Sequence, residues 1–329
     1  MTYSGKTILL AGGNGYIGCT TAFALKEAGF NPVILDDFST SKSEAQRTFK
    51  VHEVDLTDIS KARALLKSLG PVESIVHFAA RALVPESFQA PGLYYRNNLI
   101  TTANLAELAV ELGISTFVHS SSCAVYGTPE QIPIRETSPL KASSPYGDSK
   151  IMAEMILNRF QQMGNLRVLN LRYFNPAGAW SKYGWGEAHD PETHLIPNVL
   201  IAALKDLPVS VFGSNYETPD GTCIRDFIHV VDLAEAHVKA IQALQNRESV
   251  PLCLNVGTGQ GFSVLEVIRM AEKVTGKKIK ISFKPPRPGD PPHLVADNQQ
   301  MVDFLGWRPS RSLQNMIEDD WTWRTSNIK

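Results

Sequence analysis

The sequence predicts an α/β protein built on a doubly wound parallel sheet, with a smaller and discontinuous second domain toward the C-terminus. Short runs rich in β-branched residues alternate with helical patterns over the first half of the chain. These runs are almost continuously apolar, which is typical of parallel strands covered on both faces. A glycine-rich turn between Gly12 and Gly18 separates the first run from the first helix. Alternation of this kind indicates right-handed crossover connections within one sheet.

Six runs in the first half have the composition of buried strands, and we expect them to form the sheet. They are residues 7–12, 32–37, 50–56, 74–80, 116–122 and 167–174. Helical patterns fit between them, for example at residues 17–28, 98–112 and 146–163. Each helix is long enough to carry the chain from one parallel strand to the next.

The pattern changes after residue 174. Residues 175–223 are rich in glycine, proline and aromatic side chains, with one expected helix at 195–205. Residues 226–241 and 252–257 indicate a return to the main sheet, and a helix, a short strand at 278–283, a proline-rich loop and a terminal helix follow. We therefore divide the chain into one domain of residues 1–176 plus about 224–257, and a second of about 177–223 plus 258–329.

The bulk composition of the 329 residues excludes several classes of partner. Hydrophobic residues make up 43%, charged residues 20%, and the formal net charge is −1. This balance gives no reason to expect nucleic acid or an anionic membrane as a partner. No apolar run approaches the roughly 18 residues of a membrane span, and glycines break the short apolar stretch at the N-terminus, so we expect no signal peptide.

Cysteine and histidine usage indicates neither disulfides nor a metal site. The four cysteines are far apart and form no C-x-x-C pair, which favours a reducing cytoplasm. The eight histidines show no H-E-x-x-H spacing. His189 and His194 lie close together in an expected loop, but two histidines alone do not make a metal site, and we expect none there.

The turn after the first strand has the features of a dinucleotide-binding loop. Gly12, Gly15 and Gly18 form G-x-x-G-x-x-G between a strand and a helix. The first permits unusual backbone angles, the second lets the main chain approach a pyrophosphate, and the third lets helix and strand pack closely. The helix N-terminus also offers unpaired N–H groups and a partial positive charge to phosphates.

Acidic residues at the ends of the next two strands indicate which dinucleotide binds. Asp36 follows Gly18 by 18 residues, where a carboxylate accepts hydrogen bonds from the adenosine ribose 2′-OH and repels a 2′-phosphate. This position favours NAD over NADP. Asp37 beside it leaves open which carboxylate has this role, and Asp55 is placed to approach the adenine.

A serine, a tyrosine and a lysine form the candidate catalytic set. Tyr146 and Lys150 form Y-x-x-x-K at the start of an expected helix, so both side chains project from one face. Ser122 ends a strand at the carboxyl edge of the sheet, where doubly wound folds bind ligands. A tyrosine of pKa about 10 needs on the order of 4 kcal/mol of preferential phenolate stabilisation to ionise near pH 7. The Lys150 ammonium and an oxidised nicotinamide have charge of the required sign, and the Ser122 hydroxyl can hold the substrate oxygen.

Ten segments carry a family resemblance, in order along almost the whole chain. They are GGNGYIG, ILDDFS, HFAA, YYRNN, SSCAVYG, SPYGDSK, RYFNPAGA, DPETHLIP, DGTCIRDFIHVVDLAEAH and RPGDPP. Together they closely resemble the UDP-galactose (UDP-glucose) 4-epimerases, which are extended short-chain dehydrogenases. The resemblance implies a Rossmann domain for NAD, a second domain for the UDP-sugar, and interconversion of UDP-galactose and UDP-glucose.

The resemblance also implies roles for individual residues. Tyr146 is the expected catalytic base, Lys150 binds the nicotinamide ribose and tunes the base, and Ser122 orients the sugar 4-hydroxyl. With the residues argued above, the cofactor set is Gly12, Gly15, Tyr16, Ile17, Gly18, Asp36, Asp55, Phe78, Ala79, Asn98, Tyr146, Lys150 and, near the nicotinamide, Tyr173. The substrate set is Ser122, Asn175, Leu195, Phe212, Arg225, Arg287, Asp290 and Leu294.

The side-chain types of the substrate set fit a nucleoside diphosphate. Phe212 offers a face to the uracil, and Arg225 and Arg287 match diphosphate oxygens as bidentate donors. Asp290 can accept hydrogen bonds from ribose hydroxyls. Without the resemblance, Arg225 beside Asp226 is equally an ordinary ion pair, and the loop around Arg287 a solvated linker.

The implied reaction begins when Tyr146 removes the proton of the sugar 4-hydroxyl and the C4 hydride passes to NAD. The 4-keto sugar then turns about its link to the diphosphate and receives the hydride on its other face. This rotation requires that UDP is bound tightly and the hexose only weakly. The chain departs from the usual family pattern at Ala11, Ala82 and Asp148, which concerns cofactor affinity and leaves the catalytic set intact.

Three alternatives compete with this function. A 4,6-dehydratase needs an acid beside the serine, where Cys123 and Ala124 stand. A 4-epimerase of a UDP-pentose or a UDP-N-acetylhexosamine stays open, because Leu294 is intermediate in size at a position where bulk limits N-acetylated sugars in the family. A non-catalytic NAD-binding sensor commonly lacks the tyrosine or the lysine, and both are present.

Two helices carry apolar stripes at helical spacing, residues 98–112 and 150–163. Both are expected to pack on the sheet, and part of each is available to a partner. Because the family commonly dimerises through these helices, we expect a homodimer. The alternative is that the stripes belong only to the core.

Overall fold

The computed structural model describes residues 5–41, 48–164, 166–189, 191–246, 249–287 and 289–327. Its main feature is a seven-stranded sheet in the order β10-β6-β5-β4-β1-β2-β3, in which all pairs are parallel. The strands are β1 (Thr7–Ala11), β2 (Asn31–Asp36), β3 (Lys50–Glu53), β4 (Ser74–His77), β5 (Thr116–Ser122), β6 (Arg167–Tyr173) and β10 (Cys253–Val256). The expected fold class is thus confirmed.

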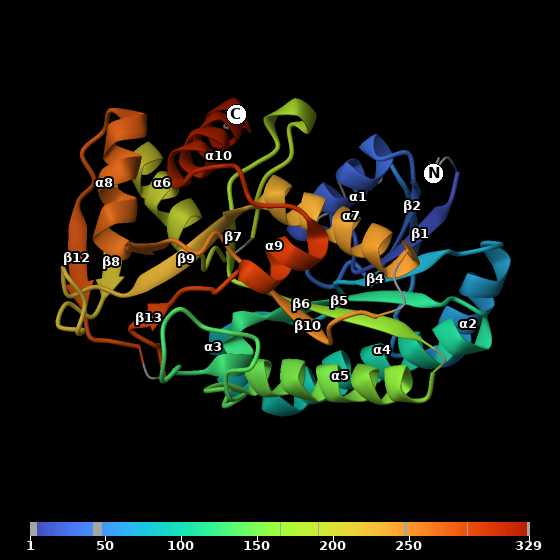
Figure 1. The fold of residues 1–329 in the computed structure, drawn as a ribbon. Coiled ribbons are helices and arrows are strands. Elements are labelled where there is room, and N and C mark those ends of the chain that lie inside the picture. The colour runs from blue at the N-terminus through green and yellow to red at the C-terminus, as the bar shows by residue number, and fades with distance from the viewer. Residues whose placement is uncertain are drawn as a thin grey trace.

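Helices cover both faces of this sheet (Figure 1), which explains the nearly continuous apolar sequence of its strands. One layer contains α1 (Tyr16–Glu27), α7 (Val230–Asn246) and α9 (Gln299–Leu305). The other contains α2 (Ile59–Ser68), α4 (Pro91–Glu111) and α5 (Pro145–Gln162), with the short α3 (Val84–Gln89) beside α4 and α5. Within the described residues, no helix is both long and apolar enough to cross a membrane.

A smaller lobe is built on two further sheets and has its own apolar core (Figure 1). In one, β9 (Ile224–His229) lies between β11 (Gly261–Ser263) and β13 (His293–Leu294), and β7 (Asn175–Ala177) also pairs with it. In the other, β8 (Val209–Phe212) pairs with β12 (Ile281–Lys284). The helices α6 (Leu195–Lys205), α8 (Val264–Thr275) and α10 (Leu313–Asn327) pack together beside them.

The expected return of residues 226–241 to the main sheet is wrong for their strand. β9 pairs in the small sheet, whereas the following α7 does pack on the main sheet against β5 and β6. The free edge of β6 is taken instead by β10, with Cys253 opposite Asn170. A short apolar run shows that a strand is buried but does not show which sheet it joins.

The sheet reverses its direction of growth between β1 and β4. From β1 the chain builds toward β2 and β3, and from β4 it builds toward β5, β6 and β10. In doubly wound folds, ligands bind outside the carboxyl ends of the strands at such a switch point. Ala11 and His77 are paired there, so the segments after them form the expected binding edge.

Candidate active site

The glycine turn after β1 lies directly against the end of β4. Gly12 has φ +72°, and a Cβ on it would lie 2.4 Å from the backbone nitrogen of Ala79. A Cβ on Gly18 would lie 2.6 Å from the Cα of Gly13, where α1 crosses the turn. Only glycine fits at both places, because the neighbouring backbone atoms cannot yield to a Cβ, and at Gly12 the positive φ also disfavours L side chains. Phe78 and Ala79 therefore lie beside the turn, as expected for one cofactor wall.

The N-terminus of α1 is left open for a ligand. Its cap is Gly15, where the nearest atom to an added Cβ is 3.9 Å away. Tyr16 begins the helix and turns away, since its hydroxyl donates to the Gly178 carbonyl at 2.5 Å, and Ile17 packs partly buried behind it. An uncapped helix N-terminus with an open approach is a ready site for a pyrophosphate.

The two neighbouring carboxylates at the end of β2 have different environments in the structure. Asp36 is buried and accepts hydrogen bonds from the Asn14 N–H at 3.0 Å and the Phe38 N–H at 2.9 Å. It therefore faces the glycine turn, whereas Asp37 binds Ser39 at the surface. Burial raises the pKa of Asp36, and its hydrogen bonds oppose that rise. Asp55 is exposed and binds Thr57.

The end of β5 lies against the start of α5, and this contact brings together Ser122, Tyr146 and Lys150. The Ser144 side chain caps α5 by accepting from the Gly147 N–H at 3.2 Å. A Cβ on Gly147 would lie 2.6 Å from the Ala124 carbonyl, so α5 starts in close contact with η2 (Cys123–Tyr126), the turn after Ser122. This packing places the Tyr146 phenol beside Ser122, whose side chain lowers the pKa of the phenol.

Lys150 lies one helical turn after Tyr146, and a hydrogen bond to β5 fixes its side chain. Its Nζ donates to the Ser120 carbonyl at 2.7 Å and lies 6.0 Å from the centroid of the Tyr146 ring. The Ser120 hydroxyl is hydrogen-bonded to the hydroxyl of Tyr173. Lys150 and Tyr173 are therefore joined through Ser120 of β5, a residue for which the sequence pattern indicated only a position near the end of a strand.

The protonation of this set differs from the sequence expectation. Burial raises the pKa of Tyr146 to about 12, although the hydrogen bond with Ser122 lowers it, so the expected acidic phenol is not a property of the protein alone. Burial lowers the pKa of Lys150 to about 8, and Glu154 opposes this. The nearby His77 is neutral, since burial and Lys150 lower its pKa to about 3. Of Tyr146, Lys150 and His77, only Lys150 thus carries a charge, and its ammonium lies close to Tyr146.

The side chain of Asn98 is hydrogen-bonded to other residues of the protein. Its amide accepts from the Arg81 N–H at 2.8 Å and donates to the Arg81 carbonyl at 3.1 Å and to the Ser149 hydroxyl at 2.9 Å. The Ser149 hydroxyl in turn donates to the Tyr146 carbonyl at 2.7 Å. Asn98 therefore fixes the loop after β4 to the start of α5.

Two pairs of expected substrate residues are in direct contact. Arg225 on β9 forms an ion pair with Asp290, which lies 65 residues further along the chain. The Arg287 guanidinium lies over the ring of Phe212, 4.0 Å from its centroid. Arg225 thus has its ion pair with Asp290 and not with the neighbouring Asp226.

The remaining substrate residues line the same lobe at different depths. Asn175 donates to the Asp226 carbonyl at 2.8 Å, and Leu195 begins α6 and packs partly buried on the second core. Leu294 is 8% exposed and belongs to the same apolar cluster as Cys123, which follows Ser122 directly. Leu294 is therefore placed near Ser122, the serine of the candidate catalytic set.

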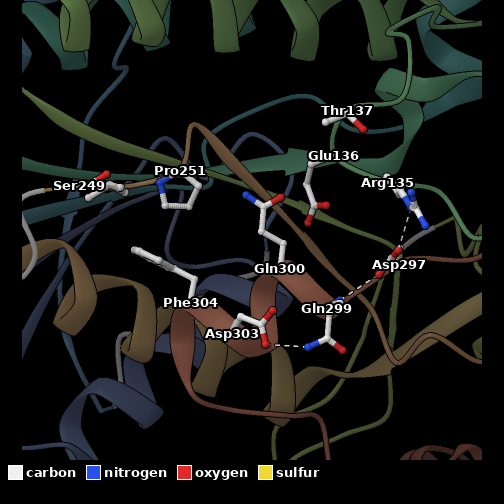
Figure 2. Close-up of a pocket in the computed structure, with 11 residues that line it drawn as sticks. Arg135, Glu136, Thr137, Ser249, Pro251, Asp297, Gln299, Gln300, Asp303 and Phe304 are labelled. Carbon is white, nitrogen blue, oxygen red and sulfur yellow. Dashed lines mark hydrogen bonds and ion pairs between the residues drawn. The ribbon is translucent and has the colours of Figure 1, made fainter.

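A separate surface pocket of about 700 Å³ lies beside α9 (Figure 2). Its walls include Glu136, Gln300 and an ion pair between Arg135 and Asp297 at 3.2 Å. None of the described residues that we expect at the cofactor or at the substrate lines it. We therefore keep this pocket apart from the candidate active site.

Comparisons with known proteins agree with the geometry. The model of the NAD dependent epimerase/dehydratase family matches residues 8–257. A UDP-glucose 4-epimerase of Rhizobium leguminosarum bv. trifolii is 42% identical over 326 residues, covering 98% of this chain and 99% of the relative.

Two crystal structures are similar over their whole length. UDP-glucose 4-epimerase from Brucella ovis in complex with NAD matches at a TM-score of 0.92 and 39% identity, covering 96% of this chain and 98% of that one. The Bifidobacterium longum enzyme in complex with NAD+ and UDP matches at a TM-score of 0.92 and 34% identity, covering 98% and 99%.

Proposed function

The chain belongs to the NAD dependent epimerase/dehydratase family, and we propose that it is a UDP-glucose 4-epimerase, an isomerase that interconverts UDP-galactose and UDP-glucose. The observation that carries this proposal is the meeting of Ser122, Tyr146 and Lys150 at the binding edge of the sheet, in a chain similar over its full length to 4-epimerases. It agrees with the resemblance found in the sequence motifs.

The residues at the switch point fit NAD. The tight packing at Gly12, the open approach at Gly15 and the inward-facing Asp36 provide a turn, an anion site and an acceptor for ribose hydroxyls. When bound, NAD takes a hydride from C4 of the sugar and returns it. We propose that Phe78, Ala79 and Asn98 form the wall beside it.

Tyr146 is proposed to move the proton of the sugar 4-hydroxyl, with Ser122 holding the same oxygen. Lowering the pKa of Tyr146 from about 12 to near 7 takes about 7 kcal/mol, at 1.4 kcal/mol for each pKa unit. Lys150, mostly charged at neutral pH with a pKa of about 8, supplies part of this stabilisation. The base therefore becomes active only when further positive charge lies beside it.

The substrate lobe is proposed to hold the nucleoside diphosphate. Arg225 is preoriented by Asp290, and Arg287 by the ring of Phe212, so both guanidinium groups are in place before a diphosphate arrives. Leu294, beside Cys123, is placed to limit the space around the hexose. Many groups then bind UDP and few bind the sugar, which lets the sugar turn.

We also propose that residues 1–176 plus about 224–257 form the NAD-binding unit, and about 177–223 plus 258–329 the UDP-sugar-binding unit. Within the described residues, the buried core of the smaller lobe is drawn from the second set, with Phe227 as the one exception. The four cysteines are free, which supports a cytoplasmic location.

A homodimer is proposed through α4 and α5, which pack side by side. Large apolar side chains are exposed on these helices and on α3: Phe88 by 52%, Ile100 by 42%, Met152 by 42% and Met155 by 65%. An apolar face of this kind typically marks an interface. Light scattering that gives one chain per particle would contradict the dimer.

The function is tested with purified protein and three substrates, UDP-galactose, UDP-N-acetylgalactosamine and UDP-arabinose, without added cofactor. We expect UDP-galactose to be converted to UDP-glucose, separated by chromatography, and the other two reactions show whether Leu294 admits further sugars. Tyr146→Phe is expected to retain NAD and to lose 10²- to 10⁴-fold of turnover, about the contribution of a general base. No conversion by NAD-containing wild-type protein would reject the proposal, and unchanged turnover in Tyr146→Phe would reject the mechanism.

A further inference from the structure

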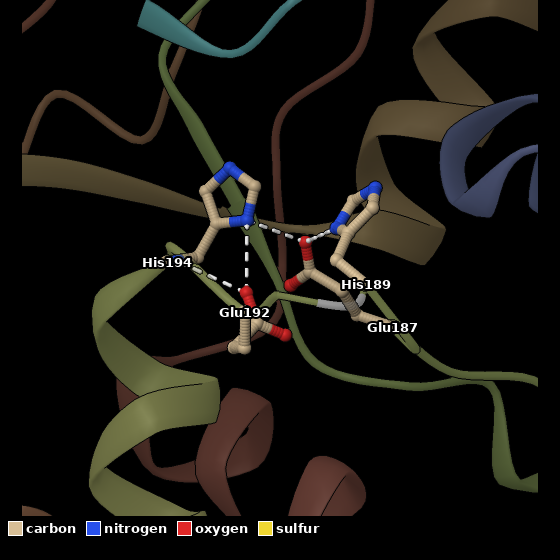
Figure 3. Close-up of side chains that lie close together, drawn as sticks. All are labelled: Glu187, His189, Glu192 and His194. Atoms are coloured by element: carbon tan, nitrogen blue, oxygen red, sulfur yellow. Dashed lines mark hydrogen bonds and ion pairs between the residues drawn. The ribbon is translucent and has the colours of Figure 1, made fainter. Parts of the chain in front are cut away.

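A second cluster of chemically active side chains lies in the loop before α6. Glu187, His189, Glu192 and His194 each bring one donor atom to a common point, and the four atoms lie within 4.8 Å of one another. Figure 3 shows the Glu187 carboxylate between the two imidazole rings and the Glu192 carboxylate beside the ring of His194. From the sequence we expected no metal at His189 and His194. The folded loop adds two glutamates, which changes that expectation.

The donor atoms are spaced much like the ligands of a tetrahedral cation. Glu187 Oε1 lies 2.9 Å from His189 Nδ1 and 2.7 Å from His194 Nδ1. His194 Nδ1 also lies 3.3 Å from Glu192 Oε1. Zinc bonds of about 2.0–2.1 Å place neighbouring ligand atoms of a tetrahedron about 3.3 Å apart, so shifts of about 1 Å at the side-chain ends complete the geometry.

In each glutamate of the cluster one carboxylate oxygen has hydrogen-bond partners and the other has none. Glu192 Oε1 accepts from the backbone N–H groups of Thr193 and His194, and Glu187 Oε1 is hydrogen-bonded to His189 Nδ1. The other oxygens, Glu187 Oε2 and Glu192 Oε2, are buried and have no hydrogen-bond partner among the described residues. The two side chains are only 3% and 7% exposed, and the Arg324 nitrogen nearest to Glu192 Oε2 is 3.9 Å away. Buried acceptors in this state are costly unless a donor or a cation meets them.

The charges around the cluster match a divalent cation once both imidazoles are in the neutral form that binds metals. The carboxylates of Glu187, Glu192 and Asp320 are all buried, and within the described residues the guanidinium of Arg324 is the one arginine or lysine paired with any of them. With neutral imidazoles, two negative charges remain uncompensated. A divalent cation cancels them, and buried carboxylates are stable when they are paired or bind a metal.

We propose that Glu187, His189, Glu192 and His194 form a structural site for a divalent transition metal, best matched by Zn²⁺. Two imidazoles and two carboxylates suit zinc, whereas Mg²⁺ and Ca²⁺ prefer six or more oxygen ligands. Four protein ligands leave no open position, which is typical of a structural site. The cation holds the loop before α6 in one conformation, and this loop contacts α10, whose Arg324 donates to the Glu187 carbonyl at 3.3 Å.

The proposal is tested by the metal content of the full chain. Protein stripped with a chelator is dialysed against Zn²⁺ with excess Mg²⁺, and bound metal is counted by mass spectrometry. We expect one zinc per chain, no magnesium, and a tetrahedral visible spectrum with Co²⁺ as the probe. Protons compete for the two histidines, so zinc affinity is expected to fall as the pH is lowered.

The variants remove donors without touching the catalytic set. His189→Asn changes a side chain that is 39% exposed and is expected to weaken zinc binding at least about tenfold. The double variant with His194→Asn is expected to bind none. His52→Asn, on the edge strand β3, is the matched control and is expected to bind zinc as the wild type does.

Two results would overturn the proposal. One is clearly less than one zinc per wild-type chain, and the other is equal zinc content in wild type and the double variant. Circular dichroism and bound NAD report whether each variant is folded. If the double variant does not fold, the cobalt spectrum of His189→Asn decides, because loss of a ligand must change it and loss of a mere ion pair leaves it as in wild type.

Discussion

Replacing Lys150 by methionine should weaken the catalytic base by an amount that the structure sets. The Lys150 Nζ lies 6.0 Å from the centroid of the Tyr146 ring. At this distance and an effective dielectric constant of about 20, one unit charge stabilises a phenolate by about 3 kcal/mol, which is about two pKa units. Lys150→Met should therefore raise the pKa of the base by about two units. Well below that pKa, kcat should fall about 100-fold, since turnover then follows the phenolate fraction.

The assay follows kcat for UDP-galactose against pH, with substrate and NAD saturating. Because the proposed base, Tyr146, must be a phenolate to act, kcat is expected to rise with pH through the pKa of the base and then to level off. Loss of the ammonium moves this rise to higher pH. Lys150→Arg keeps the charge and should keep the rise near its original place, while NAD content is checked in every variant. A Lys150→Met enzyme that loses kcat equally at all pH values would refute the electrostatic argument and leave only a positioning role.

Three further predictions concern the scaffold. Gly12→Ala places a Cβ into the backbone at the end of β4, 2.4 Å from the nearest atom, and should yield protein without bound NAD; a full complement of NAD in an acid extract would contradict this. Arg172→Met leaves Glu154, its buried partner at 2.6 Å, without a countercharge and should lower the free energy of unfolding in urea by about 3–5 kcal/mol; a loss below 1.5 kcal/mol, roughly the effect of an ordinary hydrogen bond, would show that the pair is not buried. His77 has its pKa lowered to about 3 by burial, so the unfolded chain binds more protons than the folded one below pH 6.5 and stability falls by about 3 kcal/mol on acidification to pH 4.5. His77→Leu should show a weaker fall over the same range, and an identical fall would refute the assignment.

The main sheet could be predicted from the sequence because its signals are local. Strands buried on both faces are continuously apolar, and the predicted 116–122 strand coincides with β5. The turn of Gly12, Gly15 and Gly18 could be predicted for the same reason, since its spacing is local and both Gly12 and Gly18 leave no room for a Cβ. The short strand predicted at 278–283 begins only at Ile281, because its pairing with β8 sets its limits.

What the sequence could not reveal depends on contacts between distant segments. The pairing of Arg225 with Asp290 spans 65 residues, and no spacing rule links them. The pKa of Tyr146 was expected near 7 from charges in its neighbourhood, whereas the structure shows that burial raises it. Desolvation depends on every atom packed around a group, so it cannot be estimated from the neighbours in sequence alone.

Asn98 links the proposed cofactor wall to the helix that carries the proposed base. Sequence motifs place this residue at the cofactor, but its two N–H groups and one oxygen lone pair are already used within the protein. It joins Arg81, in the loop after β4, to Ser149, whose hydroxyl binds the carbonyl of Tyr146. A shift of the loop is therefore transmitted to the first turn of α5 through two hydrogen bonds. Since a hydride and a proton must leave the same sugar carbinol, a rigid link between the wall that sets the cofactor and the helix that sets the base keeps both transfers in register.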